Sequence, residues 1–314
     1  MNLIVEVLIK TFPVIGLILL GILLRRIALI TQETIDGLKK IVVNVALPSA
    51  LFLTFARTSF RPEYLLIAAV MFGICLLMLG AGAGIGRKLQ PANPYYPALF
   101  TGFEAGMMGY SLFSSLFGSE NTYKFAVIDV GQVIFVFFIL TAFLKSRRGD
   151  KISAAFLLKD FFRSPVILAI LLGNLLGSTG LFAMFESWPA SEAVTALLGL
   201  LGDLTRPLIC LVIGYELRFS LARARKTFLT VLLRMALLLL LAFAVNELLI
   251  KGVLHLDRTF QAAVYLMFLL PPPFVIPIYM DKSTEENKSV LLDTISLHVL
   301  MSLAAAVVLV FAFR

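Results

Sequence analysis

Ionisable side chains that lie inside long apolar runs are the residues of this chain that could carry chemistry. They are Glu104, Asp129, Asp203, Arg206, Arg234, Asp293 and His298. A charged group inside a membrane is costly, and such groups usually bind ions or substrates or relay protons. These residues are therefore the first candidates for a functional site.

The same residues do not predict an enzyme. An intramembrane hydrolase needs two carboxylates that share one site. Asp129 and Asp293 would be that pair, but the chain contains no Gly-x-Gly-Asp motif. The two cysteines and two histidines are scattered without metal-ligand spacing. We expect no catalytic residue, no metal site and no cofactor.

The elements that position these residues are expected to be membrane helices. The 314 residues are 60% hydrophobic and 15% charged, and the mean hydropathy is +0.97. Soluble domains are about 45–50% apolar and about 25% charged. These values exclude a soluble enzyme, a disordered chain and a disulfide scaffold. They predict an all-α membrane protein, because backbone groups in lipid must bond internally and a barrel would show alternating segments.

Ten apolar segments are long enough to span a bilayer, which takes about 20 residues. They are 3–24, 38–56, 64–86, 95–117, 122–144, 161–181, 192–216, 227–250, 260–280 and 289–313. Most of the 27 Lys and Arg residues fall in the loops after the odd-numbered helices. This bias places those loops in the cytoplasm and both termini outside.

Membrane topology also explains the net charge of +8, so no nucleic-acid partner is expected. The pair Arg25-Arg26 follows the first apolar run, whereas a signal peptide carries its positive charge before that run. We therefore expect a retained first helix in a multi-pass protein of the plasma membrane, the inner membrane of the cell, with the lipid bilayer as its partner.

The chain repeats itself. Phe12–Leu24 and Ser164–Leu176 share nine of thirteen residues, including a Pro and a Gly eight positions apart. Two further correspondences are Asn44…Pro48 with Asp203…Pro207 and Lys124…Asp129 with Lys288…Asp293. Five spans separate each pair, and an odd number reverses the orientation. The sequence therefore predicts two inverted five-helix repeats, 1–145 and 161–314, joined by a cytoplasmic linker, 146–160. Inverted repeats are typical of secondary transporters.

Helices 4 and 9 are expected to be broken and to cross. Gly106-Met107-Met108-Gly109 aligns with Leu270-Pro271-Pro272-Pro273, and both runs disfavour a regular helix. Freed backbone groups must then be covered by protein or line a cavity. A second half-helix would begin near Tyr110 and another near Phe274. Their unpaired N–H groups would attract an anion.

Glu104 is the strongest candidate for coupling to an ion. Burial disfavours the charged form of a carboxyl group, and a protonated Glu104 could bond to a carboxylate substrate and later release its proton. A charged Glu104 would instead suit Na⁺ or a cationic substrate. Asp129 and Asp293 could bond to the amides freed at the crossing, or pair with Lys124 and Lys288.

The remaining polar residues have two interpretations each. Asn44 could bind substrate or bond to helix neighbours. Asp203 and Arg206 are three residues apart and could neutralise each other, or the arginine could meet the anion. His298 could be a packed histidine or a proton relay. Arg234 is expected to extend its charged end to the membrane surface.

Taken together, these features resemble the auxin efflux carrier family, which includes plant auxin carriers and bacterial malate or malonate permeases. Three segments carry the resemblance along the whole chain. They are Asn44–Phe52 (NVALPSALF), Arg206–Leu217 with its P-L…I-G…L pattern, and the glycine-broken helix 4 with the proline-broken helix 9.

The resemblance implies a scaffold of helices 1, 2, 6 and 7 and a moving transport unit of helices 3–5 and 8–10. It implies a homodimer and elevator-type transport of a small organic anion, a dicarboxylate or an auxin-like weak acid. From the breaks and the buried polar groups, we expect the substrate-binding residues to be Asn44, Glu104, Gly106, Met107, Gly109, Tyr110, Pro271, Pro272, Pro273 and Phe274. We expect the ion-coupling residues to be Glu104, Asp129, Asp293 and His298.

This chain departs from the family pattern in helix 4. Where the family commonly reads Asn-x-Gly-Phe-x-Gly-x-Pro, this chain has Glu104 in place of Asn and Ser111 in place of Pro. A carboxylate beside an anion site would repel the substrate. Two alternatives follow: a proton-coupled anion transporter that uses Glu104, or a sodium-coupled symporter of the bile-acid/sodium symporter type. A receptor or scaffold that transports nothing is a further alternative.

Overall fold

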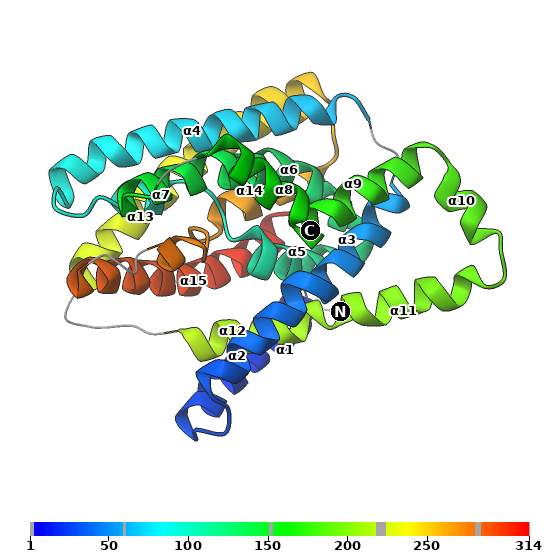
Figure 1. Cartoon of the computed structure of the whole chain (residues 1–314), viewed down its shortest axis with the longest axis horizontal. Helices are drawn as coiled ribbons and strands as arrows, with labels where there is room; N and C mark the ends of the chain where they lie inside the picture. Colours follow the sequence, from blue (N-terminus) through cyan, green and yellow to red (C-terminus); the bar gives the residue numbers. More distant parts are fainter. Residues whose placement is uncertain (1–2, 59–60, 151–152, 218–223, 280–283, 314) are drawn as a thin grey trace. The chain divides into compact units, whose positions relative to one another are not determined.

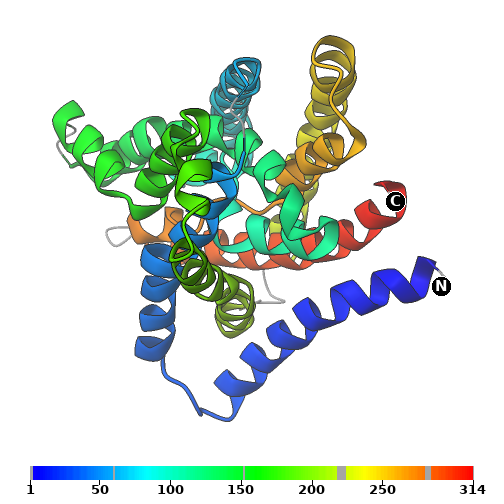
Figure 2. The ribbon, with the colours of Figure 1, turned by 90° about the vertical axis from the view of Figure 1, so that its right-hand side faces the viewer.

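The computed structural model describes residues 3–58, 61–150, 153–217, 224–279 and 284–313. These residues form helices and connecting segments, and no strand occurs among them. Figures 1 and 2 accordingly draw every regular element as a coiled ribbon. The all-α fold class expected from composition is confirmed.

Within the described residues, six helical stretches are long and apolar enough to cross a membrane. They are Gln32–Ala56, Tyr64–Leu89, Ser119–Arg148, Ser191–Glu216, Arg225–Val253 and Glu285–Phe313. They correspond to the expected helices 2, 3, 5, 7, 8 and 10. The first expected span is the helix α1 (Leu3–Arg26), and the sixth contains the 14-residue apolar helix α9 (Pro165–Ser178). The expected fourth and ninth spans are interrupted.

Several of these stretches change from α-helix to π-helix along their length. The elements are α2 (Gln32–Ile41), η1 (Val42–Ala46) and α3 (Leu47–Ala56); α6 (Thr122–Phe135), η5 (Val136–Leu140) and α7 (Thr141–Arg148); and α13 (Ala224–Ala244) with η7 (Val245–Val253). A π-helical turn inside an α-helix frees or shifts backbone hydrogen bonds, and such turns often lie at functional sites.

The chain divides into two compact units. Unit 1 comprises Met1–Pro62, Gly106–Ala126 and Asp160–Leu217. Unit 2 comprises Glu63–Ala105, Val127–Lys159 and Arg218–Arg314. Each unit therefore combines segments from the first and the second half of the chain.

Two helix pairs form the framework of unit 1, and each pair meets at a glycine. α1 packs along α12 (Thr205–Glu216), and α3 packs along α9. A Cβ atom at Gly21 would overlap with the carbonyl oxygen of Leu211, and one at Gly173 would lie 2.8 Å from the carbonyl oxygen of Phe52. Small residues allow membrane helices to approach this closely. Both glycines belong to the repeated segments.

The ends of α1 and α12 are tied together by charged side chains. Arg25 donates from Nη1 to the carbonyl oxygens of Tyr215 and Leu217, at 2.6 and 2.5 Å. Lys39 of α2 forms an ion pair with Glu216. Basic side chains that bond to the last carbonyls of a helix stabilise its C-terminus.

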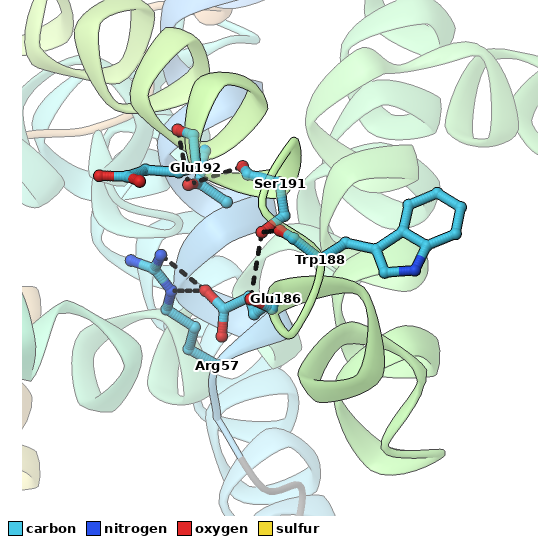
Figure 3. Close-up of polar contacts among 6 residues, drawn as sticks. Arg57, Glu186, Trp188, Ser191 and Glu192 are labelled. Carbon is cyan, nitrogen blue, oxygen red and sulfur yellow. Dashed lines mark hydrogen bonds and ion pairs between the residues drawn. The ribbon is translucent and has the colours of Figure 1, made fainter.

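The connection between α9 and α11 (Ser191–Asp203) contains the single tryptophan of the chain. Its short helix, α10 (Leu181–Glu186), is held to the end of α3, because Arg57 donates from Nε and Nη2 to Glu186 Oε1 at 2.9 and 2.8 Å (Figure 3). The Trp188 ring points away from this pair and is 70% exposed. An exposed tryptophan at the end of a candidate span is typical of a membrane–water interface.

Unit 2 contains the expected ninth segment and the first part of the fourth, up to Ala105, whereas the part of the fourth that starts at Gly106 belongs to unit 1. The further elements of unit 2 are α4 (Tyr64–Leu89), η2 (Tyr96–Phe100), α14 (Arg258–Leu269), η8 (Ile276–Tyr279) and α15 (Glu285–Phe313). Glycines again permit close contact, since a Cβ at Gly82 of α4 would lie 2.7 Å from the carbonyl oxygen of Pro97. The short helix η2 is thus held directly against α4.

Candidate functional site

The second interruption contains the expected prolines, whereas the first lies just before the glycines that were expected to form it. The first break, residues 101–104, follows η2, and the chain becomes helical again at η3 (Ala105–Gly109) and α5 (Tyr110–Phe117). The second break, residues 270–275, follows α14 and leads into η8. Gly106 and Gly109 therefore belong to a helical turn, and the expectation that they break the helix is wrong.

Backbone geometry explains the difference. The glycine that leaves the helical conformation is Gly102, whose φ is +64°, a value that other residues rarely adopt. After the second break, the described residues form a single 3₁₀ turn of four residues rather than an α-helix that starts at Phe274. Residues 280–283 lie outside the described residues.

The proline triple removes backbone donors, and other groups of unit 2 replace them. Proline has no N–H, so the last carbonyls of α14, up to that of Leu269, lose their partners four residues ahead. The carbonyls that follow are free because the chain is no longer helical there. The carbonyl oxygen of Leu269 accepts from Ser302 Oγ at 2.5 Å, and that of Leu270 accepts from Arg234 Nη2 at 3.3 Å. The carbonyl oxygen of Pro271 accepts from the N–H of Glu104 at 2.9 Å.

Glu104 connects the first break to the second. Besides its N–H bond to Pro271, its carboxylate Oε2 accepts from the N–H of Phe274 at 2.5 Å. Phe274 is the first residue after the prolines, and therefore the first with an N–H. The side chain of Glu104 is buried, with 8% exposure. The two breaks thus contact each other, and a carboxylate lies at their meeting point.

Arg234 of α13 also contacts both breaks and is fully buried. Nη1 donates to the carbonyl oxygens of Leu99 and Thr101, at 2.7 and 3.4 Å. Nη2 donates to those of Gly102 and Leu270, at 2.7 and 3.3 Å. The expectation that Arg234 extends to the membrane surface is wrong. The freed backbone carbonyls offer the guanidinium hydrogen-bond acceptors inside the protein. The charge is therefore bonded there and does not extend to the membrane surface.

Gln132 of α6 holds the first break from another side. Its Nε2 donates to the carbonyl oxygen of Phe103 at 3.2 Å, and its Oε1 accepts from the Phe103 N–H at 3.4 Å. The same Nε2 donates to Asp129 Oδ1 at 2.9 Å. Asp129, which is buried, is therefore linked to the break through a single side chain.

Asp293 and His298 lie on α15, and both are buried. Among the residues that the structure describes, neither ring nitrogen of His298 has a hydrogen-bond partner, while its carbonyl oxygen accepts from Ser302 Oγ at 2.7 Å. The imidazole lies within electrostatic range of Arg234 and near the Leu269 carbonyl. His298 is thus packed against the end of α14.

The other expected site residues belong to unit 1. Gly109 and Tyr110 are buried, and the Tyr110 ring packs edge-on against Phe125 with 5.1 Å between the centroids. The side chain of Met107 lies outside the described residues. Asn44 is exposed and donates to the carbonyl oxygen of Lys40 at 2.8 Å, so it bonds to its own helix.

Asp203 and Arg206 form the self-neutralising pair that their spacing allows. Arg206 Nη2 lies 3.5 Å from Asp203 Oδ1, and both side chains are exposed. Such a pair contributes little to stability. It lies on the framework of unit 1 rather than at the breaks.

Three residues that hold the breaks were not predicted as site residues: Arg234, Gln132 and Ser302. Each is a polar side chain inside an apolar run, and that signal was present in the sequence. That signal could not show which groups these side chains contact, because their partners are backbone groups distant in sequence. Among the described residues, no group of three His, Cys, Asp or Glu side chains could hold a metal ion.

Comparison with known proteins supports a transporter. The chain is 26% identical, over 218 residues, to an uncharacterized transporter of Methanothermobacter thermautotrophicus, and the match covers 67% of this chain and 68% of that protein. It is also 26% identical over 208 residues to an uncharacterized transporter of Methanocaldococcus jannaschii, covering 64% and 66%. The chain matches no protein-family model. Together with the apolar helices, these similarities indicate an integral membrane protein.

Proposed function

We propose that this chain is a secondary active transporter that moves a small organic anion by alternating access. The observation that carries the proposal is the contact between two helix breaks at a buried carboxylate, Glu104. Discontinuous membrane helices form the substrate and ion sites of many transporters. Similarity to two proteins described as transporters supports the same conclusion.

The packing of unit 1 supports the ten-helix inverted repeat. The offset of 152 residues that aligns the repeated segments pairs Gly21 with Gly173, and the offset of 159 pairs Phe52 with Leu211. The Gly21–Leu211 contact therefore corresponds to the Gly173–Phe52 contact with the two halves exchanged. A two-fold relation between inverted halves produces this pattern.

The division into units supports a scaffold and a transport unit, as in the auxin efflux carrier family. Unit 1 contains the expected helices 1, 2, 6 and 7, and unit 2 contains helices 3, 8, 9 and 10 and most of helix 5. Helix 4 is divided, since Gly106–Ala126 belongs to unit 1. We therefore propose elevator-type movement by a member of that family, acting as a homodimer in the plasma membrane with both termini outside.

Glu104 is proposed as the proton-binding group. Its carboxylate holds the Phe274 N–H, which a substrate carboxylate would need. Protonation of Glu104 weakens that hydrogen bond, because a neutral carboxyl group is the poorer acceptor. The N–H then becomes available to the anion, so a proton and an anion bind together. Asp129, Asp293 and His298 are the further candidates for proton transfer.

Sodium-coupled symport of the bile-acid/sodium symporter type is the second candidate. Three buried carboxyl groups in unit 2, those of Glu104, Asp129 and Asp293, favour it, since carboxylates are ligands for hard cations. Dependence of transport on Na⁺ separates the two candidates.

Counterflow in liposomes tests whether the protein is a carrier at all. Liposomes with the purified protein are loaded with unlabelled malate, and labelled malate is added outside without any ion gradient; malonate and succinate are tested in the same way. A carrier produces a transient overshoot of label inside, because the loaded substrate returns the binding site to the outside. Uptake that rises linearly with concentration and never overshoots, for all three anions, would contradict the proposal.

A further inference from the structure

We propose that Arg234 is a built-in cation that fills the position of a coupling Na⁺ and holds the two breaks together in its place. The consequence for coupling rests on the proposed transport function. The occupation of the cation position by Arg234 does not rest on that function, and it can be measured without transport.

The first argument is the set of oxygens that surrounds the guanidinium. Four backbone carbonyls point at it, three from the first interrupted segment and one from the second. They belong to Leu99, Thr101, Gly102 and Leu270. In transporters with discontinuous helices, unwound backbone carbonyls are the groups that coordinate Na⁺. Here a planar guanidinium, which offers several donors in a fixed fork, binds such carbonyls instead.

The second argument is charge. The guanidinium of arginine stays protonated in proteins, and Arg234 is fully buried. All its hydrogen bonds go to neutral carbonyl oxygens, and within the part of the chain that the structure describes it forms no ion pair with a carboxylate. A buried charge is costly unless it is well bonded. A cluster of carbonyl oxygens that have lost their helical partners supplies that bonding, as it would for a metal cation.

The third argument is which atoms of the Arg234 side chain make contacts and which do not. Its Nε is buried and has no hydrogen-bond partner in the described part of the chain, and the guanidinium carbon lies 5.5 Å from the centroid of the Phe103 ring. The side chain is therefore placed by its two terminal nitrogens and by the aromatic ring. These nitrogens are the atoms that face both breaks.

Sodium independence follows for this position. The carbonyl oxygens are already occupied, and the fixed positive charge repels a second cation from them. Coupling is then left to groups that exchange protons, of which Glu104 is bonded directly to the second break.

The test is thermal unfolding of purified Arg234→Ala in choline chloride, in sodium chloride, and in choline chloride with millimolar guanidinium. We expect a lower Tm in choline and a partial return of Tm with Na⁺ or guanidinium, whereas the wild type has the same Tm in all three. Arg206→Ala is the matched control, because Arg206 is exposed, and its Tm should not respond to either cation.

Arg234→Lys keeps the proposal testable if Arg234→Ala does not fold. Lysine retains a cation, so this variant should fold and stay indifferent to Na⁺. The proposal is overturned if Arg234→Ala is as stable as wild type, if neither cation raises its Tm, or if Arg234→Lys unfolds or becomes dependent on Na⁺. Rescue of the Tm by cations without counterflow of malate, malonate or succinate would reject the transport function and leave this inference standing. Counterflow without rescue of the Tm would support the transport function and overturn this inference.

Discussion

Replacing Glu104 with glutamine is expected to abolish proton coupling while the protein keeps its fold. Glutamine cannot bind and release a proton in the accessible pH range. Its amide oxygen can still accept the hydrogen bond from the Phe274 N–H that the carboxylate accepts at 2.5 Å. The measurement is the pH change inside liposomes, reported by an enclosed dye, when malate is added outside.

Two comparisons make this experiment specific. Glu216→Gln changes a partly exposed glutamate that pairs with Lys39 in unit 1, and it should leave proton movement as in wild type. Glu104→Leu also removes the acceptor for Phe274 N–H, so it should destabilise the fold by about 1–3 kcal/mol. Proton movement in Glu104→Gln at the wild-type rate would exclude Glu104 as the coupling group.

Leucine in place of Gly21 or Gly173 is expected to prevent the framework of unit 1 from forming. A side chain at either position meets a backbone carbonyl of the neighbouring helix, and backbone cannot rotate away as a side chain can. Overpacking of this kind costs about 1–3 kcal/mol or more. Size-exclusion chromatography in detergent and thermal unfolding would measure the loss of folded protein.

Gly16→Leu is the control, because Gly16 lies on the same helix as Gly21 and a Cβ there meets nothing within 4 Å. It should behave like wild type, within about 0.5 kcal/mol. The inverted repeat adds a further requirement: Gly21→Leu and Gly173→Leu should be similarly damaging. If Gly21→Leu is as stable as Gly16→Leu, the packing of α1 on α12 is not as described.

Hydropathy was sufficient to place most helices, because a span needs only a long apolar run. The segments 64–86 and 192–216, for example, lie within or nearly coincide with candidate spans Tyr64–Leu89 and Ser191–Glu216. The π-helical turn of η1, which includes Asn44, was not predicted. A single π turn closes its hydrogen bonds five residues apart instead of four, but it does not interrupt the apolar run, so it leaves little trace in hydropathy.

The proline break was predicted by residue type and position, whereas the glycine break was predicted by residue type alone. Pro271–Pro273 interrupts the helix as expected, because proline lacks a donor in any context. Glycine only permits an unusual conformation, so the sequence could not decide among Gly102, Gly106 and Gly109. The backbone uses Gly102, where a Cβ would lie 2.7 Å from the ring of Pro273 in the second break.

Arg234 illustrates what a single sequence cannot supply. An arginine in an apolar run can reach for the surface or bind freed backbone groups inside, and the choice depends on where the acceptors lie. Here the acceptors belong to Leu99, Gly102 and Leu270, more than 30 residues away in either direction. The sequence alone predicted that the backbone groups freed at the breaks must be covered by protein or line a cavity. It did not predict which residue bonds to them.

Charge movement in liposomes on a capacitive sensor tests the central claim most directly. Malate, malonate, succinate, an indole acid and a bile acid are added in turn at acidic and at neutral pH, with and without Na⁺. The account predicts that at least one small organic anion produces a current that follows the proton gradient and is unchanged by Na⁺. A current that requires Na⁺, or no current with any anion at either pH, would contradict it.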